Sequence, residues 1–349
     1  STTTGIDGTV AIGKDALTAL TTGAGNVAVG YQAGLLETTG AQNTFIGYGA
    51  FKAGDAGEAG NTVIGYNAGS AINDATSDNN TIVGNEAAIG GVAAMKNVVV
   101  IGSGAMIGSA GNAQDGTVAV GRSALAALTS GAGNTAIGYQ AGLLITTGAS
   151  NTIIGNGAAD ATHVDSTGNV AIGKNTFGGS HTGSGSHYNT AVGEGAMSTG
   201  ALEGVTGATA IGYSALSALT TGAGNTAVGY QALDAEDAGN NSTAVGFQAL
   251  SAQNNDTGHN TAVGWTAGDS IVAGYSNTLI GSEAGTTGSN DLASGNQNTL
   301  IGQATSVDRT NATNQTVIGR GTQGQANNSV TLGNASVTNT YLASGAIDT

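Results

Sequence analysis

The side chains best suited to chemistry in this chain are four histidines, His163, His181, His187 and His259. Imidazoles can bind a metal ion or take up a proton during catalysis. His181 and His187 share one long interval between repeated glycines, but the chain has no tight His-X-His spacing of the kind that holds zinc. We therefore expect histidines in exposed loops, no metal site and no cofactor.

Acidic side chains could bind calcium or cleave sugars. Asp55, Asp74, Asp78 and Asp237 lie in segments with turn composition, yet the glycine-rich GGxGxDxxx repeat that binds calcium in β-helices is missing. Glycoside hydrolysis needs two facing carboxylates, whereas the acids here are scattered through irregular segments. No nucleophile motif is present either. The sequence therefore predicts no catalytic residue and no enzyme.

Aromatic residues recur at one place, directly after a repeated glycine. Aromatic faces there could stack on sugar rings, or on one another from coil to coil. Four of the seven basic residues, Lys14, Arg122, Lys174 and Arg320, take the same place, where a cation would lie over a ring. The fixed spacing favours a stacked spine, which we expect to comprise Tyr31, Tyr48, Tyr66, Tyr139, Tyr213, Tyr230, Phe247 and Trp265.

Threonine also recurs, thirteen times, three residues before such a glycine. A flat, exposed threonine ladder would suit ice binding. Valine replaces threonine at Val10, Val99 and Val118, which favours a covered position. Ice binding therefore stays a lesser alternative.

All these positions are set by a phrase close to Asn-Thr-Ala-Val-Gly, which occurs nineteen times at intervals of mostly 17 to 19 residues. A short period over the whole length predicts an array of stacked units. The closing glycines are Gly13, Gly30, Gly47, Gly65, Gly84, Gly102, Gly121, Gly138, Gly155, Gly173, Gly193, Gly212, Gly229, Gly246, Gly264, Gly281, Gly302, Gly319 and Gly333.

Each repeat reads as a strand that ends at its glycine. The residue three before the glycine is β-branched in every repeat, and an aliphatic residue precedes the glycine. These two share one strand face, and the residue between them, most often alanine, points to the other. An alanine three residues after the glycine, as in Ala33, suggests a second short strand. Asparagine opens twelve repeats and should form a ladder from coil to coil.

Composition narrows the class further. The chain has 349 residues, 62 glycines, no proline, no cysteine and only 8% charged residues. Its net charge of −15 argues against nucleic acid and anionic lipid as partners. No segment approaches the roughly 20 apolar residues of a membrane helix, so we expect no membrane insertion.

The repeated phrase resembles the head repeats of trimeric autotransporter adhesins. Its fuller form, NTAIGYQAGLLITTG at 134–148, is similar to repeats of bacteriophage tail fibres, those of cyanophages in particular. The resemblance implies a parallel β-roll with three chains about one axis. Adhesin coils are shorter, at about 14 to 15 residues, so the cross-section should differ. We expect an all-β, repetitive parallel β-roll or β-helix solenoid of about 19 coils, assembled as a homotrimeric rod.

The C-terminal stretch SVTLGNASVTNTYLASGAIDT resembles the end of a fibre that precedes a self-cleaving intramolecular chaperone. We therefore divide the chain into a shaft at 1–333 and an end segment at 334–349, which the resemblance implies was followed by such a chaperone in the precursor.

The expected function is a structural phage tail fibre, located in the virion, that presents loops for host attachment. The longest intervals place these loops at 178–188 and 286–297, with His181, His187, Tyr188, Asn290 and Asp291 on the receptor side. Expected partners are the chain itself, a tail or baseplate protein or other fibre segment, and a host cell-surface glycan or protein. The alternatives are a bacterial surface adhesin, located outside the cell, and a polysaccharide-cleaving tailspike.

Overall fold

The structure is a computed structural model that describes residues 5–54, 57–90, 94–108, 114–162, 165–179, 183–254, 258–286 and 290–339. The described residues are all β-strand, turn and irregular backbone, without a helix. Contacts between residues separate two compact units, Ser1–Gly207 and Ala208–Thr349. The division falls inside the expected shaft, and only residues 334–339 of the expected end segment are described.

Nineteen short parallel strands, each just before a repeated glycine, confirm the predicted solenoid. In the first unit they are β1 (Val10–Ile12), β2 (Val27–Val29), β3 (Thr44–Ile46), β4 (Thr62–Ile64), β5 (Thr81–Val83), β6 (Val99–Ile101), β7 (Val118–Val120), β8 (Thr135–Ile137), β9 (Thr152–Ile154), β10 (Val170–Ile172) and β11 (Thr190–Val192). In the second they are β12 (Thr209–Ile211), β13 (Thr226–Val228), β14 (Thr243–Val245), β15 (Thr261–Val263), β16 (Thr278–Ile280), β17 (Thr299–Ile301), β18 (Gln315–Ile318) and β19 (Ser329–Leu332).

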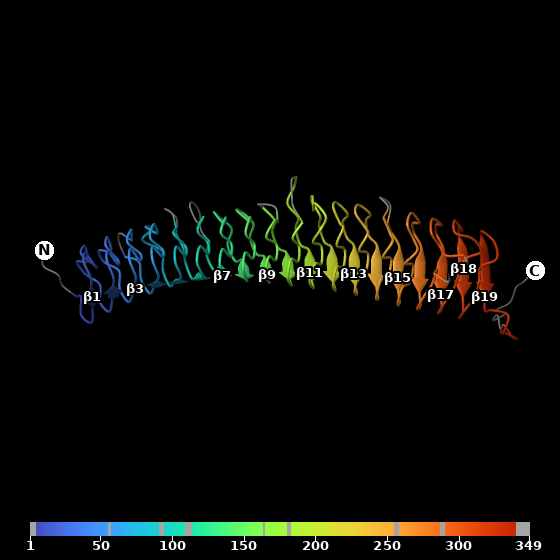
Figure 1. The fold of residues 1–349 in the computed structure, drawn as a ribbon, viewed down its shortest axis with the longest axis horizontal. Coiled ribbons are helices and arrows are strands. Elements are labelled where there is room, and N and C mark those ends of the chain that lie inside the picture. The colour runs from blue at the N-terminus through green and yellow to red at the C-terminus, as the bar shows by residue number, and fades with distance from the viewer. Residues whose placement is uncertain are drawn as a thin grey trace, which may run out of the picture. The chain divides into compact units, whose positions relative to one another are not determined.

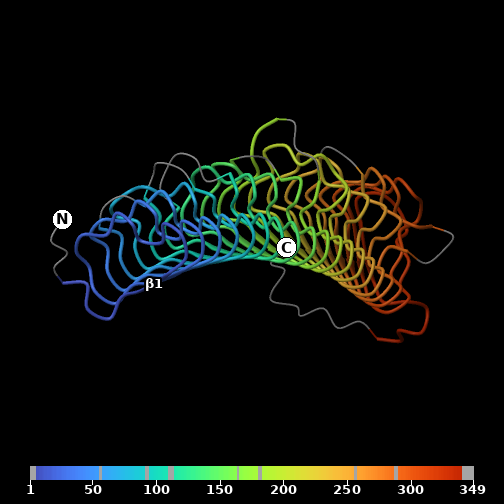
Figure 2. The ribbon, with the colours of Figure 1, turned by 60° about the vertical axis from the view of Figure 1, so that its left-hand side comes forward.

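Within each unit, equivalent residues of successive coils pair in register. Ala28 of β2, for example, lies between Ala11 of β1 and Phe45 of β3. Figure 1 shows the strands along one side of each unit and the connecting turns on the opposite side, and Figure 2 shows the coils stacked one behind another. A side-chain position in the repeat therefore becomes a row that runs from coil to coil.

The repeated glycines permit this close stacking. Gly30 has φ 140°, a value that side chains rarely adopt, and a Cβ there would lie 2.3 Å from the carbonyl oxygen of Gly47. The same contact recurs at Gly138, where the distance to the Gly155 oxygen would be 2.2 Å. Glycine is required at these positions because the next coil's backbone occupies the space of a side chain.

The prediction of a second strand after each repeated glycine is wrong, because the described residues form only one strand per repeat. The backbone there turns through left-handed residues at alternate positions, with φ 54° at Gln32 and 60° at Gly34. These turns still bind neighbouring coils, since the Gln32 N–H donates to the Lys14 oxygen at 3.0 Å and the Gly34 N–H to the Ala50 oxygen at 2.9 Å. The fixed alanine, such as Ala33, is buried in the coil.

The adhesin resemblance implies that either the alanine face or the aliphatic face of the strand contributes to a trimer interface, and the structure buries the alanine face. Ala136, Ala227 and Ala262 are completely buried inside their own coils. The flanking residues point outward instead: Thr135 is half-buried and Ile137 is 39% exposed. Each coil thus encloses a core of its own, and the aliphatic row is left on the surface.

The asparagine ladder is present and fully buried. The Asn26 Oδ1 accepts the backbone N–H of Asn43 at 2.9 Å, while its Nδ2 donates to the Gly40 oxygen at 2.7 Å. Side chains also bond directly, as where the Asn151 Nδ2 donates to the Asn134 Oδ1 at 3.0 Å. These bonds satisfy backbone groups that the short strands leave unpaired.

Candidate functional site

An apolar band lies on the strand side of the coils. It combines the aliphatic residue before each repeated glycine with the aromatic residue after it, and we call these two rows the outward strip. No charged residue occupies the aliphatic row in any of the nineteen repeats. Its most exposed members, from 36% to 59%, include Ile12, Ile46, Tyr48, Tyr66, Ile137, Tyr139, Ile211, Tyr213, Tyr230, Val245, Phe247, Val263 and Trp265.

Aromatic rings of the outward strip stack coil over coil. In the first unit, Tyr48 lies 4.9 Å from Tyr31 and 5.2 Å from Tyr66 between ring centroids. Ring planes in these pairs differ by 22° and 16°. Tyr139 is flanked by Arg122 and Asn156 in the equivalent places, so the row there continues through a cation instead of a ring.

The second unit has a longer stack. Tyr213, Tyr230, Phe247 and Trp265 follow one another, with centroid separations of 5.2, 5.1 and 6.5 Å. A ring inside such a stack has both faces covered by its neighbours and presents mainly its edge. Trp265, 52% exposed, is followed by Ser282 at the equivalent place. This geometry limits sugar stacking along the row, because a sugar ring needs an open aromatic face.

Basic residues extend the row at its breaks. The Lys14 ammonium and the Arg122 guanidinium each lie 5.8 Å from the ring centroid of the next coil's tyrosine, Tyr31 and Tyr139 respectively. Lys174 forms a salt bridge of 3.2 Å with Glu194 in the following coil. Both partners are exposed, so this pair adds little stability.

His187 and Tyr188 lie just before β11. The His187 Nδ1 accepts the Thr167 N–H at 3.2 Å, which leaves Nε2 as the hydrogen-bearing nitrogen of the neutral ring. Tyr188 is 69% exposed and has φ 58°. The same left-handed position is glycine in eight repeats, including Gly168 of the preceding coil. The Tyr188 ring packs against Gly168. His181 lies outside the described residues.

The second candidate loop brings acids together in the second unit. The Ser270 Oγ donates to the Asp269 Oδ1 at 3.1 Å and lies 3.4 Å from the Asp291 Oδ2. Burial, with the nearby Asp291 and Glu283, raises the pKa of Asp269 above its ordinary value. Asn290 is half-buried. Burial also raises the pKa values of Asp160 and Asp234, which occupy the same repeat position as Asp269.

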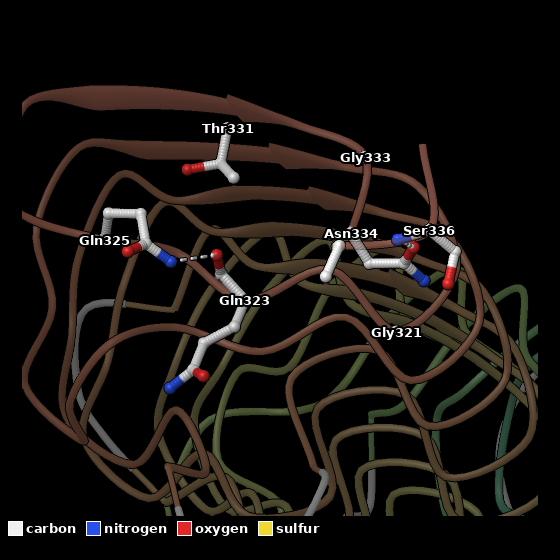
Figure 3. Close-up of a pocket in the computed structure, with 8 residues that line it drawn as sticks. Gly321, Gln323, Gln325, Thr331, Gly333, Asn334 and Ser336 are labelled. Carbon is white, nitrogen blue, oxygen red and sulfur yellow. Dashed lines mark hydrogen bonds between the residues drawn. The ribbon is translucent and has the colours of Figure 1, made fainter. Parts of the chain in front are cut away.

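A pocket of about 410 Å³ lies at the last coils of the second unit (Figure 3). It is lined by backbone and neutral side chains, and the Gln325 Nε2 donates to the Gln323 oxygen at 3.0 Å. Such a pocket offers hydrogen bonds to a polar, uncharged ligand but no acid or base. The lining residues are Gly321, Gln323, Gln325, Thr331, Gly333, Asn334, Ala335 and Ser336.

Sequence reasoning missed two buried acids of the first unit, Glu37 and Glu58. A self-comparison of the chain contains the signal, because Ile145 stands in place of Glu37 in the near-copy of that block. A residue equivalent to a core isoleucine is expected inside the coil.

Within the described part of the chain, no group of three or more His, Cys, Asp and Glu side chains is arranged to hold a metal ion. The same residues include no helix of the length and hydrophobicity that crossing a membrane requires. No protein-family model matches the sequence, and no curated protein is significantly similar to it.

Proposed function

We propose that the protein is a structural, non-catalytic fibre of a phage tail, assembled as a homotrimer, which presents loops for attachment to a host surface. The observation that carries this proposal is the outward strip. Each coil buries its own core, yet leaves an uncharged aliphatic residue on its strand side, which is joined in eight coils by an exposed or half-buried aromatic residue. Contiguous apolar surface of this extent is typical of an interface between protein chains.

A second copy of the chain is the occupant that this surface fits best. The outward rows repeat at the spacing of the coils, so only a partner with the same repeat matches them over many coils. Three copies about an axis would cover the strip on every chain and leave the turns, on the opposite side of each unit (Figure 1), free to contact a host.

Two variants of one coil test the assembly. Ile137, on the outward strip, and Leu144, in the turn that follows, are 39% and 48% exposed. Ile137→Glu should place like charges together in the interface and shift the protein toward monomer, whereas Leu144→Glu should leave the trimer intact. Sedimentation equilibrium measures both. A wild-type chain that is monomeric at micromolar concentration, or equal behaviour of the two variants, would contradict the proposed interface.

The attachment site that the structure favours is Tyr188 with His187. Tyr188 is the one aromatic residue at a left-handed position that the other repeats fill with glycine or with a polar residue such as Asn79 or Ser150, and this conformation costs a tyrosine about 1–2 kcal/mol. An exposed ring beside an imidazole N–H suits a neutral sugar. The net charge of −15 disfavours acidic polymers.

Tyr188→Ala should reduce binding of labelled trimer to host cells or to a neutral-glycan array at least tenfold without changing assembly. Tyr275→Ala is the matched control, since Tyr275 is also exposed, at 40%, but lies in the second unit. If both variants bind as the unmodified protein does, attachment resides elsewhere.

Ice binding is a second candidate, favoured by one observation. In the second unit, seven successive strands, β12 to β18, each carry a half-buried outward threonine, and these are paired in register: Thr209, Thr226, Thr243, Thr261, Thr278, Thr299 and Thr316. This row uses the face proposed for assembly, so it could meet ice only in a monomer. Thermal hysteresis from a folded monomer would support ice binding, and a folded monomer without thermal hysteresis would exclude it.

A further inference from the structure

One acidic side chain of the second unit lies inside its coil. Glu236 is completely buried, seven residues after its repeated glycine, at a place that the preceding coil fills with the buried Leu219. Its Oε1 accepts the Gly239 N–H at 2.5 Å and the Ala238 N–H at 3.3 Å. Its Oε2 accepts a hydrogen bond from the Nε2 of the buried Gln253. Both oxygens of the carboxyl group therefore face N–H donors.

Gln253 begins a row of buried side-chain amides, which we call the amide chain. Its Oε1 accepts the Asn260 Nδ2 at 2.8 Å. The Asn277 Nδ2 then donates to the Asn260 Oδ1 at 3.1 Å, and the Asn298 Nδ2 donates to the Asn277 Oδ1 at 3.0 Å. All four amides are buried. Each of them therefore turns its NH2 group toward Glu236.

The backbone fixes this direction. The Asn260 Nδ2 also donates to the Gly274 carbonyl oxygen at 2.7 Å, and the Asn260 Oδ1 accepts the Asn277 N–H at 2.9 Å. A reversed Asn260 amide would lose both bonds, so its NH2 group stays turned toward Gln253. Gln253 must then present its oxygen to Asn260 and its NH2 group to Glu236. The row of donors therefore ends on the carboxyl group.

The charge on that carboxyl group should be felt along the amide chain. Aligned hydrogen bonds polarise one another, so a charge at one end strengthens the bonds further along. A carboxylate accepts stronger hydrogen bonds than a neutral carboxyl group does. We propose that Glu236 is a pH-responsive device of the second unit, whose change between neutral and ionised forms is transmitted along the amide chain to Asn298, at the start of β17.

The first unit contains a similar ladder that ends on neutral groups. The Asn169 Nδ2 donates to the Asn151 Oδ1 at 3.2 Å, and the Asn151 Nδ2 donates to the Asn134 Oδ1 at 3.0 Å, in the same direction. The Asn134 Nδ2 in turn donates to the carbonyl oxygens of Gly131 and Gly148. Because backbone carbonyls do not titrate, this ladder provides a control within the same chain.

The pH dependence follows from the direction of the shift. Burial is the largest cause that raises the pKa of Glu236 above its ordinary value of 4.5, while the hydrogen bonds from Gln253 and Gly239 lower this pKa and the adjacent Asp237 raises it. Folding therefore takes up a proton. The resulting stabilisation is complete below the ordinary pKa and is lost as the pH rises through the raised pKa of the folded state.

Basic groups do not offset the charge of Glu236. The basic side chains of the second unit are Arg309, Arg320 and His259, and none of them contributes to the shift in the pKa of Glu236. The next coil meets the carboxyl group with a neutral amide, and Asp256 in that coil lies outside the described residues. An ionised Glu236 is therefore a buried charge held by N–H donors.

Nuclear magnetic resonance of the full chain, isotope-labelled at the side-chain nitrogens of asparagine and glutamine, tests the transmission. Between about pH 4 and pH 8, the amide signals of Gln253, Asn260 and Asn277 should shift with one common midpoint. The size of the shift should fall with distance from the carboxyl group. The Asn151 signal is the control and should not follow this transition. Absent shifts, or equal shifts in the two ladders, would overturn the proposal.

Two variants identify the titrating group. Glu236→Gln keeps the shape of the side chain but cannot ionise, and Glu236→Leu reproduces the residue found at Leu219, which the coil interior accommodates. Both should abolish the transition at Asn260 and Asn277. Asp237→Asn should preserve the transition and move its midpoint to lower pH, because Asp237 raises the pKa of Glu236. A transition that persists in both Glu236 variants would refute the proposal.

Chemical denaturation supplies a readout that does not depend on the amide signals. The free energy of unfolding of the unmodified protein, minus that of Glu236→Leu, should fall as the pH rises through the midpoint seen in the amide chain. A difference that is constant over this range, or that changes at another pH, would contradict the assignment to Glu236.

Discussion

Residues 8–47 and 116–155 of the first unit are near-copies that fold alike but differ inside. Their turn backbones match closely, with φ 48° at Leu17 and 49° at Leu125, and 54° at Gln32 and 56° at Gln140. The buried differences are Glu37 against Ile145 and Phe45 against Ile153. Repeated backbone positions therefore fix the coil, whereas one interior position can exchange a hydrocarbon for a carboxyl.

The difference shows where a repeat array can acquire a new property. The glycine, asparagine and alanine positions bind each coil to the next, so a change there affects the stack. The place seven residues after the glycine is enclosed by a single coil and its neighbours. A polar group can enter there if the next coil supplies a partner, as Gln253 does for Glu236.

The largest expected loss of stability comes from changing a repeated glycine, and it should be equal in the two near-copies, which we call the first block (8–47) and the second block (116–155). Gly30→Ala and Gly138→Ala each force a Cβ to within 2.3 and 2.2 Å of the next coil's carbonyl oxygen, so each should cost more than about 4 kcal/mol in the free energy of unfolding. Gly116→Ala is the control. Its φ is 67° and no atom lies within 4 Å of its Cβ, so it should cost only about 1–2 kcal/mol. Chemical denaturation at fixed protein concentration measures all three.

Ile145→Glu sharpens the comparison, because it places a carboxyl in the second block without a partner. Ser166 stands there in place of Glu58. We expect a loss of about 3–4 kcal/mol at neutral pH and a smaller loss below pH 4, where the carboxyl is neutral. Leu144→Glu, one residue away and exposed, should change the free energy of unfolding by less than about 0.5 kcal/mol. A tolerated Ile145→Glu would mean that the coil interior admits water.

Removing one asparagine of the ladder should lower the free energy of unfolding by the same amount in the two near-copies. Asn134→Ala leaves the buried Asn151 N–H and the Gly148 carbonyl without their side-chain partners, which should cost about 2–3 kcal/mol. Asn26→Ala should give the same value within error. Asn156→Ala, at an exposed position, is the control and should have little effect. A marked difference between the first two variants would break the equivalence of the copies.

The smallest expected effect on the free energy of unfolding comes from removing Lys14 or Arg122, whose charged groups lie over tyrosine rings. Lys14→Ala and Arg122→Ala each remove one exposed contact of 5.8 Å, so each should cost about 0.5 kcal/mol. A double-mutant cycle of Arg122→Ala with Tyr139→Ala isolates this interaction. A coupling energy near zero would show that the alignment of cation and ring reflects the repeat alone.

Much of the fold could be predicted from the repeated positions. Strands, their register and the ladder of Asn26, Asn43 and their equivalents follow from the period, because equal spacing forces equal residues to stack. The turn after the glycine could not be predicted from the sequence, because a small residue such as Ala33 fits a strand and a tight turn equally well. The inward face was equally ambiguous, because alanine and valine are both small and apolar.

The candidate sites divide in the same way. The regular spacing of Tyr31, Tyr48 and Tyr66 placed these rings in one row, which a period can encode. The burial of Glu37 and Glu58 could not be found from the period, because most other coils carry uncharged residues at these two places.

The direction of the bonds between coils has a mechanical consequence. Within each unit, the strand bonds and many of the turn and asparagine hydrogen bonds join one coil to the next, so a pull along the stacking direction loads one coil's bonds at a time. A coil of 17 residues occupies about 4.8 Å of the stack but releases about 60 Å of extended chain when it peels away. Each unit should therefore unfold one coil at a time under force. The length released at each step lets the chain extend and dissipate a sudden load before a covalent bond is strained.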